Sequence, residues 1–183
     1  MLANSKMGYG LISILIHWIS ALTVIGLFGL GLWMVDLTYY SSWYKTAPDI
    51  HKSVGILLFG LTLLRLVWRF ISVKPQADSA HKPWEQQSAK WAHRGIYLLM
   101  LAIMASGFLI STADGRGIIV FDWFEVPSLG GFITNQEDIA GLVHEYLAYS
   151  LIGLVIIHGA GAIKHQFIDK DNTLVKMIKP VRK

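Results

Sequence analysis

Four histidines stand within long apolar stretches of the chain, where an ionisable side chain is costly unless it has a partner or a function. They are His17, His51, His144 and His158. Imidazole is a common protein ligand for both haem iron and zinc. Each histidine taken alone is explained equally well by a hydrogen bond to a neighbouring helix. Taken together, their spacing favours a shared role in holding a cofactor.

The spacing predicts two pairs of histidines. His144 and His158 are separated by close to four helical turns, or ~21 Å along a helix axis, so they share one helix face at two depths. Consecutive membrane helices run antiparallel, which places His17 of the first apolar stretch at the depth of His158. The same argument places His51 of the second stretch at the depth of His144. Facing helices of a bundle can clamp a flat macrocycle between such pairs.

The chemistry expected of these pairs is electron transfer. Two histidine ligands fill both axial positions of a haem iron, so no position stays open for binding oxygen. The chain contains no cysteine, which excludes thiolate-bound iron–sulfur clusters and haem attached through a C-x-x-C-H motif. Zinc is the competing metal, but a zinc site needs three or four ligands that converge on one point. A histidine-based metal transporter is a further alternative, and its optical spectrum would show no haem.

Membrane-spanning helices are the elements that must position these histidines. Of the 183 residues, 54% are hydrophobic and only 15% are charged, and the mean hydropathy is +0.48. The apolar residues gather into four runs, each long enough to cross ~30 Å of hydrocarbon. We therefore expect an all-α fold, an integral membrane four-helix bundle. It would form a single membrane domain over residues 1–183, with transmembrane helices at about 11–35, 48–71, 91–111 and 139–163.

Glycines in three of the four runs offer room for a macrocycle beside the helices. Small residues also serve ordinary helix packing in membranes, so the glycines are a weak signal by themselves. The candidates are Gly26, Gly29, Gly55, Gly60, Gly153, Gly159 and Gly161.

Lysine and arginine near the ends of the runs predict the orientation, because positively charged connections stay in the cytoplasm. Residues 69–94 and the C-terminal tail carry most of these charges. The first connection carries only Lys45, and the third, residues 112–138, has only Arg116 among five acidic residues. Both termini are therefore expected to be cytoplasmic. The aromatic segment 118–124 is expected to lie along the outer membrane interface, where it could form a lid.

Several short motifs extend this interpretation over essentially the whole chain. Besides His144 and His158, they are residues 16–18 (Ile-His-Trp), 50–56 (Ile-His-Lys-Ser-Val-Gly-Ile), 63–69 (Leu-Leu-Arg-Leu-Val-Trp-Arg), 93–99 (His-Arg-Gly-Ile-Tyr-Leu-Leu), 164–167 (Lys-His-Gln-Phe) and 169–174 (Asp-Lys-Asp-Asn-Thr-Leu). Each motif is short, but the set is specific. The sequence resembles the bacterial cytochrome b561 family of four-helix, di-haem membrane proteins.

The resemblance implies two noncovalent b-type haems. It assigns His17 and His158 as axial ligands of the inner haem iron, and His51 and His144 as those of the outer haem iron. It also implies a quinone at the inner haem, where His165 matches the quinone-pocket position. In the best understood branch the protein is an oxidoreductase in which superoxide reduces the outer haem and quinone is reduced on the cytoplasmic side of the membrane. A multi-pass protein of the bacterial inner membrane is implied, with no nucleic-acid partner.

The electron donor on the outer side stays open at this point. A site that steers superoxide should be electropositive, and Lys45, Lys52 and Arg116 offer positive charge there. The outer connections together are acidic, however. Superoxide is the leading candidate donor. The alternative is an electron-transfer and anchor module for a periplasmic redox protein, with no small-molecule substrate of its own.

Two further residues near the expected inner haem have open roles. Arg65 could contact a haem propionate, but a side chain that reaches toward the membrane interface explains it equally well. His93 could support a haem ligand or transfer protons, or it could simply stand at a helix start near the lipid headgroups.

Overall fold

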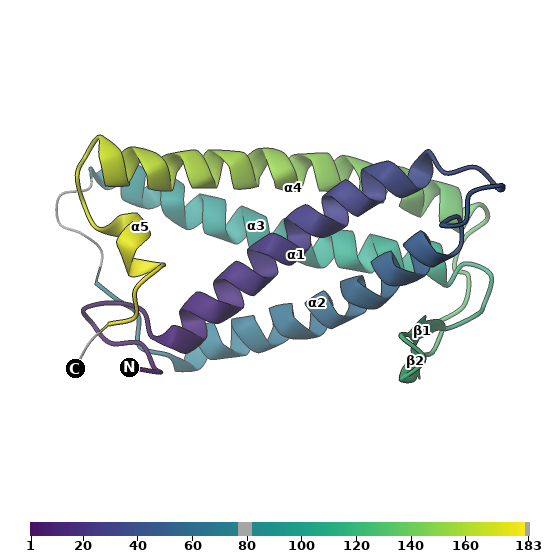
Figure 1. The fold of residues 1–183 in the computed structure, drawn as a ribbon, viewed down its shortest axis with the longest axis horizontal. Helices are drawn as coiled ribbons and strands as arrows, with labels where there is room; N and C mark the ends of the chain where they lie inside the picture. The colour runs from purple at the N-terminus through teal and green to yellow at the C-terminus, as the bar shows by residue number, and fades with distance from the viewer. Residues whose placement is uncertain (77–81, 182–183) are drawn as a thin grey trace. The chain divides into compact units, whose positions relative to one another are not determined.

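Four long α-helices make up most of the computed structural model, which describes residues 1–76 and 82–181 (Figure 1). They are α1 (Leu11–Val35), α2 (Thr46–Ile71), α3 (Pro83–Ser111) and α4 (Gln136–Phe167), and the short α5 (Thr173–Lys176) follows. All four long helices are long and apolar enough to cross a membrane. The expected four-helix integral membrane fold is therefore confirmed. Two basic residues of the tail, Arg182 and Lys183, lie outside the described residues.

Large apolar side chains are exposed along all four helices. Leu22 of α1 and Leu64 of α2 are each 65% exposed, Leu98 of α3 is 69% exposed and Ile157 of α4 is 67% exposed. Continuous apolar surface on this scale is unfavourable in water and marks a surface that contacts other apolar groups. Lipid contact explains these exposed faces.

Helix α3 begins at Pro83, before the apolar run that predicted a start near residue 91. Proline suits the first turn of a helix, because its missing N–H would have no partner there. Glu85 then accepts a hydrogen bond from the backbone N–H of Lys82 (3.0 Å), as in a capping box. The first two turns are polar, so hydropathy alone places the helix start too late.

Helix α4 also extends beyond its apolar run, from Gln136 to Phe167 rather than from residue 139 to 163. Glu137 and Asp138 lie in its first turn, and Lys164 and His165 in its last. Negative charge at the start and positive charge at the end of a helix both stabilise it through the helix dipole. These polar turns are helical although they contribute nothing to the hydropathy signal.

The chain divides into two compact units, and each unit contains part of every long helix. The first, named here the His17 unit, consists of Met1–Ala21, Leu61–Tyr97 and Gly153–Lys183. The second, the His51 unit, consists of Leu22–Gly60 and Leu98–Ile152. Each predicted histidine pair falls within one of these units.

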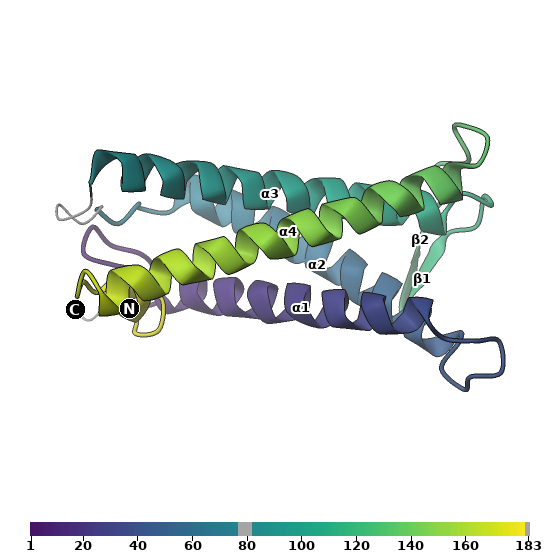
Figure 2. The ribbon, with the colours of Figure 1, turned by 90° about the horizontal axis from the view of Figure 1, so that it is seen from above.

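In the His17 unit, the N-terminal segment lies beside the C-terminal segment (Figure 2). Hydrogen bonds join the two segments. The N-terminal ammonium of Met1 donates to the carbonyl of Val181 (2.8 Å), and the N–H of Val181 donates to the carbonyl of Tyr9 (2.9 Å). The first turn of α1 leaves N–H groups without intrahelical partners. One of these groups, the N–H of Leu11, donates a hydrogen bond to the carbonyl of Met1 (3.1 Å).

In the His51 unit, the segment between α3 and α4 forms a two-stranded antiparallel hairpin. Strand β1 (Ile118–Val120) pairs with β2 (Phe124–Val126). The buried hydroxyl of Ser53 in α2 holds the hairpin, because it donates to the carbonyl of Ile119 (3.4 Å) and accepts from the N–H of Phe121 (3.2 Å). The aromatic segment is thus tied to α2 close to His51. Its position at the outer interface stays a prediction.

Candidate functional site

His51 of α2 and His144 of α4 lie next to each other in the His51 unit, as the sequence predicted. Their ring centroids are 6.2 Å apart and their planes are inclined by 66°. Nδ1 of His144 lies 2.9 Å from the carbonyl oxygen of Ile103 in α3. Nδ1 of His51 is buried and has no hydrogen-bond partner among the described residues. The two rings are therefore held differently.

The contact with Ile103 selects one tautomer of His144. A carbonyl oxygen can only accept, so Nδ1 carries the proton and Nε2 keeps a lone pair that can bind a metal. This is the usual arrangement of a metal-ligating histidine, whose second nitrogen donates to a carbonyl or carboxylate. The hydroxyl of Ser106 in α3 joins the same group, since Oγ donates to the Ile103 carbonyl (2.9 Å) and lies 3.1 Å from Nδ1 of His144.

Two glycines make room for these imidazoles. A Cβ atom on Gly107 would lie 3.0 Å from Cε1 of His144, and one on Gly31 would lie 3.4 Å from Cε1 of His51. Neither glycine was identified from the sequence. One feature of the sequence could have pointed to them. A glycine in the interior of a helix is less favourable than alanine by about 1 kcal/mol, so its presence there suggests a packing or functional role. A Cβ atom added to any of the glycines named from the sequence would have no neighbour within 4 Å, which leaves open space beside those helices.

His17 of α1 and His158 of α4 form the second predicted pair, within the His17 unit. Their ring centroids are 6.4 Å apart, with an interplanar angle of 71°. His93 of α3 joins them, since its ring centroid is 5.0 Å from that of His158. Nδ1 of His93 lies 2.7 Å from the carbonyl of Ala89 and therefore carries a proton. The structure thus brings a third imidazole to this pair.

The ring separations distinguish the possible ligand pairs. Two imidazoles bound through nitrogen to opposite sides of one metal ion have ring centroids roughly 6 Å apart, because each metal–nitrogen bond is about 2 Å long. The His51–His144 and His17–His158 separations of 6.2 and 6.4 Å fit this arrangement. The 5.0 Å between His93 and His158 is too short for it. Within residues 1–76 and 82–181, no three His, Asp or Glu side chains form a group that could hold a metal ion.

Arg65 of α2 lies directly against the His17–His158 pair. Its Nη2 donates to Nδ1 of His17 at 2.9 Å, and its guanidinium lies over the ring of Tyr97, 5.4 Å from the centroid. Arg69 lies over the same ring at 5.6 Å. Arginine only donates, so Nδ1 of His17 accepts here and the proton stands on Nε2. Ligation through Nε2 would move that proton to Nδ1 and release Arg65 to another acceptor.

His165 belongs to a separate ionic cluster in the His17 unit. Its Nδ1 lies 2.7 Å from Oδ2 of Asp169. Nζ of Lys164 donates to the same oxygen at 2.7 Å and to Oε1 of Glu85 in α3 at 2.6 Å. The hydrogen bond from Lys164 is the main reason that the pKa of Asp169 lies below its ordinary value. The sequence pointed to His165 and to the 169–174 motif that contains Asp169, but not to Glu85.

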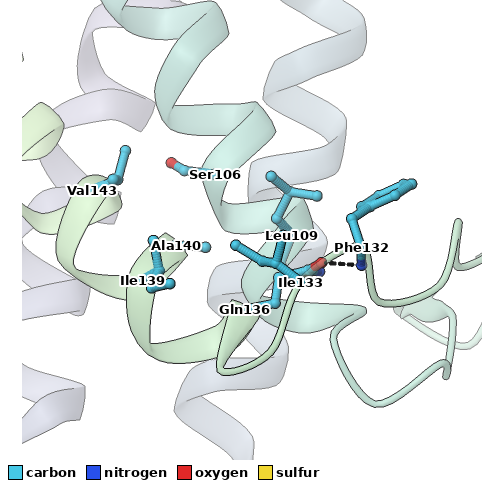
Figure 3. A pocket seen from close by; sticks show the side chains of 8 residues that line it. All are labelled: Ser106, Leu109, Phe132, Ile133, Gln136, Ile139, Ala140 and Val143. Atoms are coloured by element: carbon cyan, nitrogen blue, oxygen red, sulfur yellow. Dashed lines mark hydrogen bonds between the residues drawn. The ribbon is translucent and has the colours of Figure 1, made fainter.

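An apolar pocket lies beside Ser106 in the His51 unit (Figure 3). It has a volume of about 200 Å³, and it is lined by Ser106 and Leu109 of α3, by Phe132 and Ile133, and by Gln136, Ile139, Ala140 and Val143 of α4. The side chain of Gln136 is held in this lining, because it accepts from the N–H of Phe132 (2.7 Å) and donates to the carbonyl of Leu109 (2.9 Å). The remaining lining is almost entirely apolar.

These features define a class of protein: an integral membrane helical protein with two histidine pairs, each spaced to hold one metal ion from opposite sides. The residues fit a haem group, because a carbonyl that selects the tautomer of His144 and glycines that make room beside the rings are present. Facing helices of membrane and soluble bundles commonly build cofactor sites in this way.

Comparison with known proteins identifies the family. Residues 8–180 match the family model described as prokaryotic cytochrome b561, so the chain belongs to this family. It is 48% identical over 175 residues to cytochrome b561 homolog 2 of Escherichia coli (strain K12), which covers 96% of this chain and 93% of that protein. It is 27% identical over 173 residues to cytochrome b561 homolog 1 of the same organism, with 93% and 96% covered.

A further relative carries a functional name. The chain is 27% identical over 171 residues to the "Probable superoxide oxidase CybB" of Yersinia pestis, covering 93% of this chain and 95% of that protein. Membership of the cytochrome b561 family implies b-type haem and electron transport. The chain is thus a multi-pass bacterial membrane protein that transfers electrons and has redox partners.

Proposed function

We propose that the chain is a di-haem cytochrome that carries electrons across the bacterial inner membrane. In this proposal His17 and His158 ligate the iron of one b-type haem, and His51 and His144 ligate that of the other. The observation that carries the proposal is the matched ring spacing of the two pairs, 6.4 and 6.2 Å. Bound haem would supply one-electron redox chemistry at each pair, with both axial positions filled by the protein.

The orientation and the single membrane domain belong to the same proposal. Both termini would face the cytoplasm, with the His17–His158 pair on the inner side of the membrane and the His51–His144 pair on the outer side. The basic residues support this arrangement, because they concentrate in residues 69–94 and in the tail. The hairpin held by Ser53 would then lie over the outer haem.

Quinone is the proposed electron acceptor on the cytoplasmic side, near His165. Reduction of one quinone to quinol consumes two electrons and two protons. His165 is proposed to take part in proton delivery, because its contact with Asp169 orients the ring. Arg65 is proposed to contact a haem propionate once it leaves His17, and His93 to support the ligand pair from its position beside His158.

Superoxide is the leading proposed donor on the outer side, supported by the name of the relative from Yersinia pestis. Oxidation of two superoxide ions to dioxygen would release the two electrons that one quinone requires. The electron would enter at the His51–His144 haem and leave at the His17–His158 haem. The protein would then be an oxidoreductase that couples superoxide oxidation to quinone reduction.

A second candidate function is supported by the charges of the His51 unit. Lys52 forms an ion pair with Asp49 (2.9 Å), and Nε of Arg116 donates to Asp114 at 2.6 Å. The Arg116 guanidinium holds the pKa of Asp114 below its ordinary value, so this carboxylate stays charged. Paired cations attract an anion such as superoxide weakly. An electron-transfer and anchor module for a periplasmic redox protein would not need such attraction.

Haem content tests the ligand pairs directly. We expect the purified wild type to show a b-type reduced-minus-oxidised spectrum with two haems per chain. Replacement of His158 by alanine should remove one haem, and replacement of His144 should remove the other. A haem content that neither substitution changes would refute the assignment of these histidines as ligands.

The donor is tested on the same preparation. Superoxide added to the oxidised protein should reduce the haems and, with quinone present, be consumed catalytically. A module for a partner protein would stay oxidised under superoxide and would instead be reduced by a periplasmic protein.

A further inference from the structure

The ring nitrogen of His144 that faces away from the proposed iron has two oxygen neighbours. The carbonyl of Ile103 lies at 2.9 Å and the hydroxyl of Ser106 at 3.1 Å. The Ser106 hydroxyl donates its own proton to the Ile103 carbonyl (2.9 Å), so its lone pairs are directed to accept from Nδ1–H of His144. The Nδ1–H of this ring is therefore shared between two acceptors.

The surroundings make this shared hydrogen bond electrostatically strong. Ser106 is only 5% exposed, and Leu109, Ala140 and Val143 lie beside it in the apolar pocket (Figure 3). A hydrogen bond in such a low-dielectric site is stronger than the same bond in water. The opposite ring, His51, offers the contrast, because its Nδ1 is buried without a partner among the described residues.

We propose that Ser106 is a positioning residue that fixes the ring of His144 and lowers the reduction potential of the haem at the His51–His144 pair. This inference rests on the proposed function, in which His144 ligates haem iron. Hydrogen-bond acceptors on the outer nitrogen of a ligating histidine raise its basicity. A more basic ligand stabilises the oxidised, more positive iron relative to the reduced iron. A second acceptor adds to this effect and restrains rotation of the ring.

The consequence concerns the direction of electron flow. At the other pair the cationic Arg65 lies against His17 (2.9 Å), and it would stay beside the haem after ligation released it from Nδ1. A nearby positive charge favours the reduced haem, because reduction removes one positive charge from the site. The His51–His144 haem would thus have the lower potential of the two. Electrons would pass downhill from it to the His17–His158 haem.

Redox potentiometry on the purified holoprotein, followed through the optical spectrum, tests the role of Ser106. In Ser106→Ala we expect one of the two reduction potentials to rise, by a three- to tenfold change in the reduction equilibrium constant; tenfold corresponds to 59 mV for a one-electron couple. The second potential should stay unchanged. The low-spin electron paramagnetic resonance signal of the same haem should shift. The control is Ser150→Ala in the same unit, whose hydroxyl donates to the carbonyl of Tyr146 (2.8 Å).

A second pair of variants separates the hydroxyl from the shape of the side chain. Ser106→Thr and Ser106→Val introduce side chains of nearly equal shape, and only threonine retains the hydroxyl. We expect a wild-type potential in the threonine variant and a raised potential in the valine variant. Equal potentials in these two variants would overturn the proposal, even if Ser106→Ala failed to retain its haem.

The outcomes also separate this inference from the proposed function. Two haems in the wild type, one in His144→Ala and an unshifted potential in Ser106→Ala would overturn the role of Ser106 alone. Two haems retained in His144→Ala would overturn both, because His144 would then not be a ligand. Equal shifts of both potentials in Ser106→Ala would also contradict a local effect on one haem.

Discussion

The two histidine pairs have almost the same spacing but different surroundings. The rings of His51 and His144 meet neutral groups, namely a carbonyl, a hydroxyl and two glycines. The rings of His17 and His158 meet the cation Arg65 and the third imidazole of His93. Spacing decides what a pair can hold, whereas the neighbouring charges and hydrogen bonds decide how strongly each site favours an electron. The ring spacing is nearly the same at the two pairs, but the electrostatic environment is not.

The two pairs also differ in which ring nitrogen carries the proton. His144 already carries its proton on Nδ1, as a ligand bound through Nε2 requires. His17 accepts from Arg65 at Nδ1, and under the proposed assignment it would have to exchange this contact before it could bind iron. We therefore expect the His51–His144 pair to bind haem with less rearrangement than the His17–His158 pair.

The largest expected effect tests which histidines ligate the two haems. Replacement of His51 by alanine should lower the haem content from two per chain to one, because one axial ligand is lost. Replacement of His93 by alanine should leave two haems, because the 5.0 Å ring separation from His158 does not fit ligation of one metal from both sides. Haem quantitation by a pyridine haemochrome spectrum measures both. Loss of a haem in His93→Ala and not in His51→Ala would reverse the assignment.

The glycines beside the His51–His144 pair should give the next largest effect. In Gly107→Ala the new methyl group would lie 3.0 Å from His144, so the ring must shift. We expect about 1–3 kcal/mol of destabilisation from overpacking, together with partial loss of one haem. Gly141→Ala is the control, because a Cβ atom there has no neighbours within 4 Å. Thermal unfolding and haem content in detergent measure both variants, and equal behaviour would contradict close packing of the ring.

Arg65 offers a way to sharpen the electrostatic contrast. Arg65→Gln removes the cation beside His17, so the potential of the His17–His158 haem should fall. A half-buried charge at this range contributes on the order of 1 kcal/mol, or roughly 40 mV for a one-electron couple. Arg116→Gln is the control, since that side chain is 87% exposed and pairs with Asp114 in the other unit. A fall of both potentials in Arg65→Gln, or a rise of either, would argue against a local charge effect.

The smallest expected effect concerns the ionic cluster of the His17 unit. The Lys164 ammonium holds the pKa of Asp169 below its ordinary value of 3.8. A carboxyl with a depressed folded-state pKa stabilises the fold above its unfolded pKa, and this contribution is lost as the pH falls through the folded pKa. In Lys164→Met, the unfolding temperature should therefore fall less steeply than that of the wild type below about pH 4. Lys90→Met serves as the control and should follow the wild type.

Sequence alone was sufficient for the helices and for the expected histidine pairs. A run of apolar residues and the helical repeat are local properties, so they can be read without knowing the fold. The four spans and the expected pairing of His51 with His144 and of His17 with His158 followed from such properties, whereas the family followed from the resemblance of short motifs. The polar first turns of α3 and α4 were missed, because hydropathy carries no signal there.

The tertiary structure decided what surrounds each ring. Ile103 and Ser106 reach His144 from another helix, and Gly107 makes room for it. Glu85 and Lys164 are 79 residues apart in the chain yet form an ion pair. No local pattern marks such neighbours, because each depends on how separate helices pack and rotate against one another. The sequence therefore determined which side chains could hold a cofactor, and the packing of the helices determined the hydrogen bonds and charges that distinguish the two sites.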